Sequence, residues 1–243
     1  MNHSSIPLML FFIGIACMER KDSFIVGEIY HIYNRGVDKR NIFQDRNDRD
    51  RFRDRLYVYN TERAVNFRDV PEAFAFERGE TTVDILAYTL MPNHFHLLIH
   101  EKKEGGISSF LGKLLTSYAM YFNTKYQRSG PLMCRPFRSS HVGDDTYLRW
   151  VFAYIHLNPL ELIEPSFKER GIQNAKRAYM HLKSHAHSSY YDYFCADRKE
   201  SSILSRDALP VELSDFAKGD ELFSILQEAS VQDAFTATDK FLA

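Results

Sequence analysis

Apolar side chains gather in three short runs of this chain that predict β-strands. Residues 25–33 are rich in β-branched and aromatic side chains, and residues 83–88 and 94–99 are further apolar runs. Met91, Pro92 and Asn93 separate the second and third runs. Because proline cannot donate a hydrogen bond to a neighbouring strand, we expect a bend or an edge there. The pattern leaves open whether the two runs are hairpin partners or one bent strand.

Helical spacing of apolar residues predicts three longer helices. Residues 46–59 carry a narrow apolar stripe among charges of alternating sign, which is typical of a helix with a solvated face. Residues 107–126 are strongly amphipathic, with Ser108 as the expected N-cap. Residues 146–157 follow the capping pair 144–145, and Pro159 should end that helix. This mixed order of strands and helices predicts an α+β sandwich, with helices packed on a mostly antiparallel sheet.

Length and composition are those of one sizeable domain, or of one domain with an appendage. The chain has 243 residues, is 44% hydrophobic and carries a net charge of −1, so it shows no global basic signal for nucleic acid. Three widely spaced cysteines fit neither a disulfide framework nor a zinc finger, which favours a reducing, cytoplasmic compartment.

The two ends of the chain differ from its middle. Residues 6–17 are almost wholly apolar but fall short of the roughly 20 residues that a membrane span needs, so we expect no membrane association. We expect translation to begin at Met18, with residues 1–17 as an extension, 18–195 as the functional domain and 196–243 as a small helical or irregular appendage.

Two histidines in the third strand run are the first candidates for chemistry. His94 and His96 are two positions apart, so on a strand they share one face and form half of a metal site. The plainer interpretation is two partly exposed sheet histidines. Tyr154 and Asn158, four residues apart, share a helical face, with His156 pointing elsewhere.

Convergence of these two pairs would create a catalytic site. If the helix face meets the strand, two imidazoles and the Asn158 carbonyl oxygen could hold a divalent cation beside Tyr154. A tyrosine oxygen activated in this way could attack a phosphodiester. Leu148, Phe152 and Ile155 form a different stripe that should face the core.

Four segments of the chain, in order, resemble segments of single-tyrosine HUH transposases. They are residues 30–36 with 42–43, 91–98, 130–138 and 154–159. The resemblance is strongest to REP-associated tyrosine transposases and their IS200-like relatives. The resemblance runs from about residue 25 to about residue 193. It implies a ferredoxin-like fold and a magnesium- or manganese-dependent enzyme that nicks and rejoins single-stranded DNA, at a hairpin or repeat. It also implies Tyr154 as the nucleophile, taking the 5′ phosphate and releasing a 3′ hydroxyl, and His94, His96 and Asn158 as metal ligands.

Basic residues add a candidate DNA-binding surface. Residues 113–150 carry six basic residues against Asp144 and Asp145, a local charge of +4. For any single arginine a solvated charge is the better interpretation. The candidate contacts are Arg35, Lys39, Arg128, Arg135, Arg138 and Arg149.

Alternatives remain at this point. Tyr118, Tyr121 and Tyr126 are rival tyrosines, although Tyr118 falls on an apolar stripe and the other two lack a partner four residues on. The protein could instead be a catalytically quiet DNA-binding protein of the same fold, or a zinc hydrolase that uses water. Whether it acts as a monomer or a homodimer is also open.

Overall fold

A four-stranded antiparallel sheet forms the centre of the computed structural model, which describes residues 23–216 and 222. The strands are β1 (Ile29–Arg35), β2 (Asp84–Met91), β3 (His94–His100) and β4 (Arg138–Val142), in the spatial order β2-β3-β1-β4. With α1 between β1 and β2, and α2 between β3 and β4, this is the ferredoxin-like arrangement. The predicted α+β fold is therefore confirmed.

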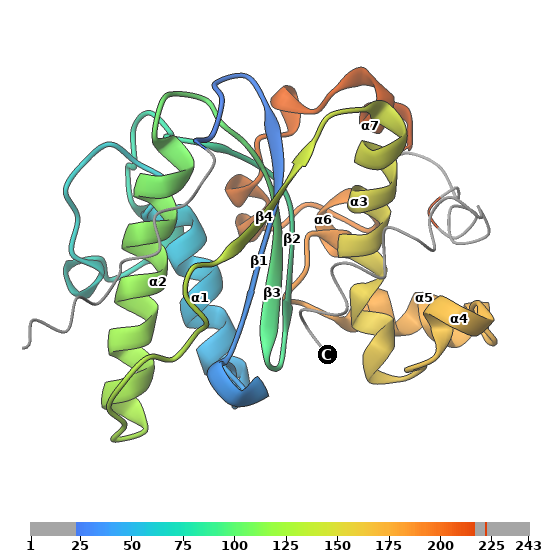
Figure 1. The fold of residues 1–243 in the computed structure, drawn as a ribbon, viewed down its shortest axis with the longest axis horizontal. Coiled ribbons are helices and arrows are strands. Elements are labelled where there is room, and N and C mark those ends of the chain that lie inside the picture. Colours follow the sequence, from blue (N-terminus) through green and yellow to red (C-terminus); the bar gives the residue numbers. More distant parts are fainter. Residues whose placement is uncertain (1–22, 217–221, 223–243) are drawn as a thin grey trace, which may run out of the picture.

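Helices cover both faces of the sheet (Figure 1). On one face lie α1 (Arg46–Val58) and α2 (Gly106–Lys125), and on the other lies α3 (Asp145–Leu157). Shorter helices follow α3, namely α4 (Phe167–Arg170), α5 (Ala175–Ser184), α6 (Tyr190–Phe194) and α7 (Val211–Phe216). Short 3-10 turns are Val37–Lys39, Phe67–Asp69, Ala73–Ala75, Asn158–Leu162, Lys199–Ile203 and Arg206–Ala208.

Side chains on β3 alternate between two hydrophobic cores. Phe95, Leu97 and Ile99 belong to the core under α1 and α2, whereas Leu98 belongs to the core under α3. At the edge, Leu86 and Ala87 of β2 both face α3 because a bulge there shifts the register against β3. His94 and His96 consequently point to the α3 side.

The question of hairpin or bent strand is decided in favour of the hairpin. Strands β2 and β3 pair antiparallel through a tight turn at Pro92 and Asn93. The Pro92 carbonyl accepts hydrogen bonds from the backbone N–H groups of Ile42 and Phe43, and the Asn93 carbonyl accepts one from Gly36. This turn therefore lies against the loop that follows β1.

Two predicted boundaries were wrong. The first strand covers residues 29–35 rather than 25–33, because Asn34 and Arg35 still pair with Phe95 and His94. Helix α2 is not capped by Ser108. Its N-cap is Gly105, and the carboxylate of Glu101 accepts a hydrogen bond from the Ile107 N–H at 2.7 Å.

The segment from residue 187 to residue 205 covers the outer edge of β2. The Leu90 N–H donates to the His187 carbonyl, the Ser189 N–H donates to the Tyr88 carbonyl, and the Ser205 N–H donates to the Ile85 carbonyl. An edge strand left open would offer the same groups to another chain. We call residues 187–205 the edge segment.

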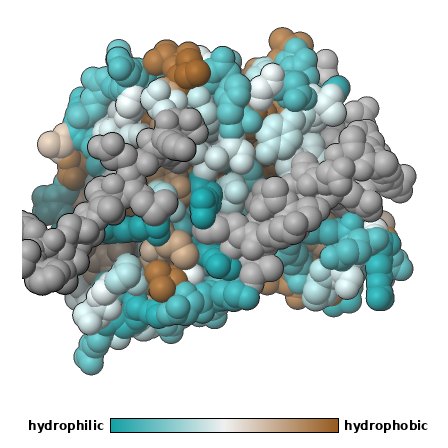
Figure 2. Space-filling view, viewed as in Figure 1, coloured by the Kyte–Doolittle hydropathy of each residue, from teal (hydrophilic) through white to brown (hydrophobic). Residues whose placement is uncertain are grey.

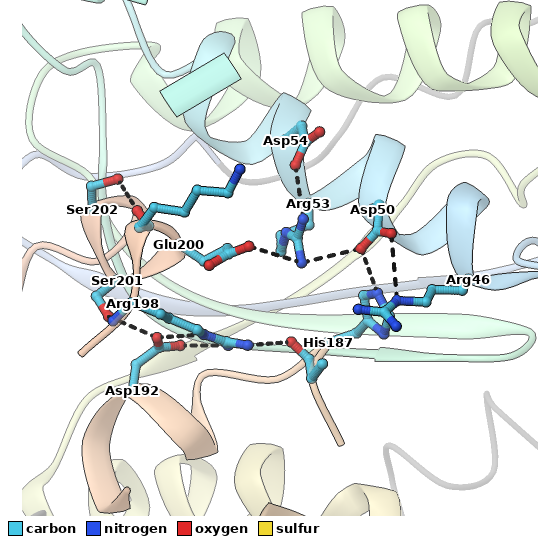
Figure 3. A network of polar contacts seen from close by, with 12 residues as sticks. Arg46, Asp50, Arg53, Asp54, His187, Asp192, Arg198, Glu200, Ser201 and Ser202 are labelled. Carbon is cyan, nitrogen blue, oxygen red and sulfur yellow. Dashed lines mark hydrogen bonds and ion pairs between the residues drawn. The ribbon is translucent and has the colours of Figure 1, made fainter. Parts of the chain in front are cut away.

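Ion pairs hold the edge segment in place (Figure 3). The guanidinium of Arg53 on α1 contacts Asp50, Asp54 and, at 3.3 Å, Glu200 of the edge segment. Within the segment, Arg198 donates two hydrogen bonds of 2.8 Å to the buried carboxylate of Asp192. The edge segment is therefore tied to α1 as well as to β2.

The predicted appendage joins the domain as far as it is described. Ile203 is fully buried in the core under α1 and α2, and Leu213 of α7 is fully buried against α3. The predicted extension 1–17, the start at Met18 and residues 223–243 lie outside the described residues.

The visible surface is mostly hydrophilic (Figure 2). Within the described residues, no helix is both long enough and apolar enough to cross a membrane. Cytoplasmic localisation stays a prediction.

Candidate active site

His94 and His96 share one face of β3, as predicted, but they are not surface residues. His94 is 5% exposed and His96 is fully buried. On the neighbouring strand β1, Arg35 pairs with His94 and Tyr33 pairs with His96. Helix α3 packs over this face, so the interpretation as two partly exposed sheet histidines was wrong.

Helix α3 brings its polar groups to the same face of the sheet. Its N-cap is Asp144, whose carboxylate accepts a hydrogen bond from the Tyr147 N–H at 2.8 Å. At its other end, Asn158 keeps helical angles despite the following proline, because a 3-10 turn continues there. The Asn158 carboxamide oxygen lies 3.2 Å from Nε2 of His94.

Tyr154 lies beside the histidines and is 1% exposed. Its ring stands perpendicular to that of His96, with 5.1 Å between ring centroids, and it stacks on Trp150. The ammonium of Lys168 on α4 lies 4.9 Å from the centre of the Tyr154 ring and pairs with Glu161. Tyr154, His94, His96 and Asn158 thus converge, because the helix face that carries Tyr154 and Asn158 meets the strand, which the spacing had left open.

The stripe of Leu148, Phe152 and Ile155 on α3 faces the core, as predicted, and the side that carries Tyr154 is buried as well. Every residue from Trp150 to Leu157 is buried, because the sheet covers one side of the helix and later elements cover the other. His156, for example, donates from Nδ1 to the Phe152 carbonyl at 2.9 Å, and its Nε2 is hydrogen-bonded to the Ser189 hydroxyl at 2.7 Å. Its role is therefore packing.

Burial keeps the imidazoles of the site uncharged at neutral pH. It lowers the pKa of His94 to about 4 and holds the pKa of His96 well below its ordinary value. A neutral imidazole has the lone pair that a metal ligand needs. Nδ1 of His94 contacts the side-chain oxygen of Asn93 at 2.7 Å, which leaves Nε2 directed at Asn158.

Several buried polar atoms around this point have no hydrogen-bond partner among the described residues. They are Nε2 of His96, the side-chain nitrogen of Asn158, the Thr89 hydroxyl and Nδ1 of His31. Unpaired buried polar atoms are rare, because each one has lost its bonds to water. The donor set therefore fits a divalent cation held by two imidazole nitrogens and one carboxamide oxygen. No described group of three histidine, cysteine or acidic side chains offers a different site.

Two residues of this site, His31 and Lys168, have no role predicted from the sequence. His31 of β1 lies with its Nε2 2.9 Å from Nδ1 of His96. Lys168 comes from a segment where the sequence signal is weak. His31 lies on an assigned strand, but its contact with His96 depends on strand register, which the sequence alone does not supply.

Four of the six candidate DNA contacts surround the end of the sheet where His94 lies. Arg35 ends β1, Lys39 is exposed in the loop after it, and Arg135 and Arg138 are exposed at the start of β4, next to β1. Arg128 follows the end of α2 and donates to the Asn123 side chain. Arg149 is exposed near the start of α3, toward the other end of the sheet.

The rival tyrosines lie on the other side of the sheet. Tyr118 is fully buried, and its hydroxyl donates to the Ile42 carbonyl at 2.5 Å. The hydroxyls of Tyr121 and Tyr126 both donate to the carboxylate of Asp48. None of the three contacts the histidines.

Comparison with known proteins gives the family. A family model described as "Transposase IS200 like" matches residues 27–158, which contain both strand histidines, Tyr154 and Asn158. The chain belongs to the IS200-like transposase family. Transposases act on DNA, so DNA is the substrate class of this IS200-like transposase.

One solved structure is similar to this transposase over much of its length. It is a REP-associated tyrosine transposase bound to a REP hairpin, with 13% sequence identity and a TM-score of 0.47. The similarity covers 75% of this chain and 89% of the other. Among curated proteins none matches.

Proposed function

We propose that this transposase cleaves and rejoins single-stranded DNA through a covalent bond between Tyr154 and a 5′ phosphate. The observation that carries the proposal is the convergence of Tyr154 with His94, His96 and Asn158 in one buried polar layer between β3 and α3. Among the described tyrosines, the three rivals on α2 and after it contact no such group.

The proposed reaction exchanges one phosphodiester for another. The Tyr154 oxygen forms a bond to phosphorus, the bond from phosphorus to the 3′ oxygen breaks, and the phenolic proton leaves to solvent while the 3′ oxygen takes one up. Attack of a 3′ hydroxyl on the phosphotyrosine reverses these steps and rejoins DNA. His94, His96 and Asn158 would hold Mg²⁺ or Mn²⁺, which when bound neutralises charge on the phosphate and orients it.

Burial of the site requires an opening step. Tyr154 is 1% exposed, and Lys168 of α4 lies over its ring. A DNA strand reaches the phenol only when side chains over it move aside. The basic residues around the end of the sheet, Arg35, Lys39, Arg135 and Arg138, would then guide the backbone of the strand.

Covalent capture tests the proposal. A library of oligonucleotides labelled at the 3′ end, with and without hairpins, is incubated with the protein and Mn²⁺ and separated on a denaturing gel. We expect a labelled protein band that is absent for Tyr154→Phe and present for Tyr121→Phe. Cleavage that survives Tyr154→Phe without a covalent band would identify a hydrolase that uses water, and binding without cleavage would identify a quiet DNA-binding protein.

The state of assembly belongs to the same proposal. We propose that each active site is built within one chain, whether the protein is a monomer or a homodimer, because Tyr154, His94, His96 and Asn158 converge within one chain. Mixing Tyr154→Phe with His96→Ala protein should therefore restore no covalent capture.

A further inference from the structure

A histidine outside the proposed ligand set lies directly behind His96. His31 of β1 is fully buried, and its Nε2 is 2.9 Å from Nδ1 of His96. The two rings are nearly parallel, at 21°, with 5.1 Å between centroids. The register pairs Tyr33 with His96 and His31 with Leu98, so His31 is the diagonal neighbour of His96 on the same face.

The direction of this hydrogen bond decides whether His96 can bind a cation. A bond between two neutral imidazoles has one N–H donor and one lone-pair acceptor. If His31 donates, His96 carries its own hydrogen on Nε2 and has no lone pair there. If His96 donates from Nδ1, its Nε2 keeps the lone pair that a metal ligand needs.

His31 is the group that can set this choice. Within residues 23–216, the only hydrogen bond of the His96 ring runs to His31, and Nε2 of His96 has no partner. The remaining ring neighbours of His96 include Tyr33, with its ring 6.0 Å away, and the perpendicular ring of Tyr154. These two contacts fix the plane of the imidazole, but a hydrogen-bond acceptor is needed to hold the proton on Nδ1.

We propose that His31 is a positioning residue for the cation, accepting the Nδ1–H of His96 so that His96 Nε2 points its lone pair at the metal. The inference rests on the proposed function, because it assumes that His94, His96 and Asn158 hold a divalent cation. His31 itself is not a ligand, because its Nε2 accepts from His96 and the hydrogen of its neutral ring is therefore on Nδ1. Groups that orient a metal-bound histidine from behind commonly control metal affinity.

Metal binding without DNA tests this role. In His31→Leu the acceptor is lost at similar volume, and in His31→Gln the amide oxygen lies near the former Nε2 and accepts again. We expect His31→Leu to weaken Mn²⁺ binding to the full chain, measured by electron paramagnetic resonance, by about 10–100-fold. His31→Gln should recover most of that loss.

A matched control comes from β3, the strand that carries His96. His100 is on the same face of β3, bonds to Asp84 at 2.9 Å and lies away from the site, so His100→Gln should bind Mn²⁺ as the wild type does. Wild-type affinity in folded His31→Leu would overturn the positioning role alone. Equal loss in His31→Leu and His31→Gln, with both folded, would also overturn it. A wild type that binds no Mn²⁺ would instead overturn the proposed cation, and the positioning role with it.

A second measurement does not depend on any variant folding. Nitrogen-15 NMR of the wild-type imidazoles with saturating Mg²⁺ reports which ring nitrogen of His96 carries hydrogen. We expect hydrogen on Nδ1. Hydrogen on Nε2 under those conditions would overturn the inference.

Discussion

Burial decides what each tyrosine and histidine of this protein can do. The four groups of the proposed site are buried on the α3 side of the sheet, whereas Tyr118 is buried on the other side among aromatic rings. Two buried tyrosines thus differ only in their partners. Tyr154 faces imidazoles and an amide, and Tyr118 donates to a backbone carbonyl.

Tyr118→Phe should destabilise the fold and leave the chemistry intact. Burial raises the pKa of Tyr118 far above its ordinary value, so its hydroxyl is a permanent donor to the Ile42 carbonyl. Removing that hydroxyl leaves a buried carbonyl unpaired, which costs about 1–3 kcal/mol of unfolding free energy in urea titration. Covalent capture of DNA should match that of the wild type. Unchanged stability would contradict this account of Tyr118.

The ion pair of His100 and Asp84 predicts a pH dependence of stability. Its hydrogen bond to Asp84 raises the pKa of His100. Burial tends to raise the pKa of Asp84, but hydrogen bonds from His100 and Ser205 hold it below its ordinary value. The contribution of His100 to the free energy of unfolding is complete below its unfolded pKa, about 6.5, and is lost as the pH rises through its folded pKa. The contribution of Asp84 exists above its unfolded pKa, about 3.9, and is lost as the pH falls through its folded pKa.

His100→Gln should therefore cost more stability at mildly acidic than at alkaline pH. Because both side chains are partly exposed, we expect the substitution to lower the free energy of unfolding by about 0.5–1 kcal/mol near pH 5.5. The loss should be smaller well above the folded pKa of His100. Urea titrations of both proteins across this range measure the difference. A loss that stays constant over the range would rule out the charged pair.

At the scale of elements, the site is built where β3 and α3 meet. β3 fixes the spacing of His94 and His96 because alternate residues share a face, and α3 fixes Tyr154 and Asn158 because residues one turn apart share a side. A substitution that frays the start of α3 should therefore lower the stability of the fold more than it disturbs the site, because the site lies at the far end of the helix.

Asp144→Ala tests the cap of α3. The Asp144 side chain accepts a hydrogen bond from the Tyr147 N–H at 2.8 Å, and its loss should lower the unfolding free energy by about 1 kcal/mol. Asp144→Ser, which keeps an acceptor, should recover most of this loss in thermal unfolding. Equal losses in both variants would show that the charge near the helix start, rather than the cap, matters.

At the scale of the whole molecule, the edge segment completes the sheet on the β2 side. The matched family region ends at residue 158, yet residues 187–205 pair with β2 and place Ile203 in the core. The buried Asp192 is paired with Arg198 within this segment. The domain boundary that we predict at residue 195 cuts through these contacts.

Ending the chain after Cys195 should strongly destabilise it. The truncation removes Arg198 from Asp192, and an unpaired buried charge commonly costs about 3–5 kcal/mol. It also removes Ile203, and the single variant Ile203→Ala in the full chain should cost about 2–4 kcal/mol. Thermal unfolding and light scattering measure both. A chain of residues 1–195 as stable as the full chain would support the predicted boundary.

Local patterns in the sequence were enough to predict the α+β class, the extents of α1 and α3, the cap within the pair Asp144–Asp145 and the two residue pairs of the site, whereas the ferredoxin-like arrangement was implied by the family resemblance. Each depends on spacing along one element, which backbone geometry converts into a shared face. The pairing of β2 with β3 as a hairpin, the burial of the site and the contacts of His31 and Lys168 depended on the tertiary structure. These depend on register and packing between segments far apart in the chain, and no local period encodes which distant side chains meet.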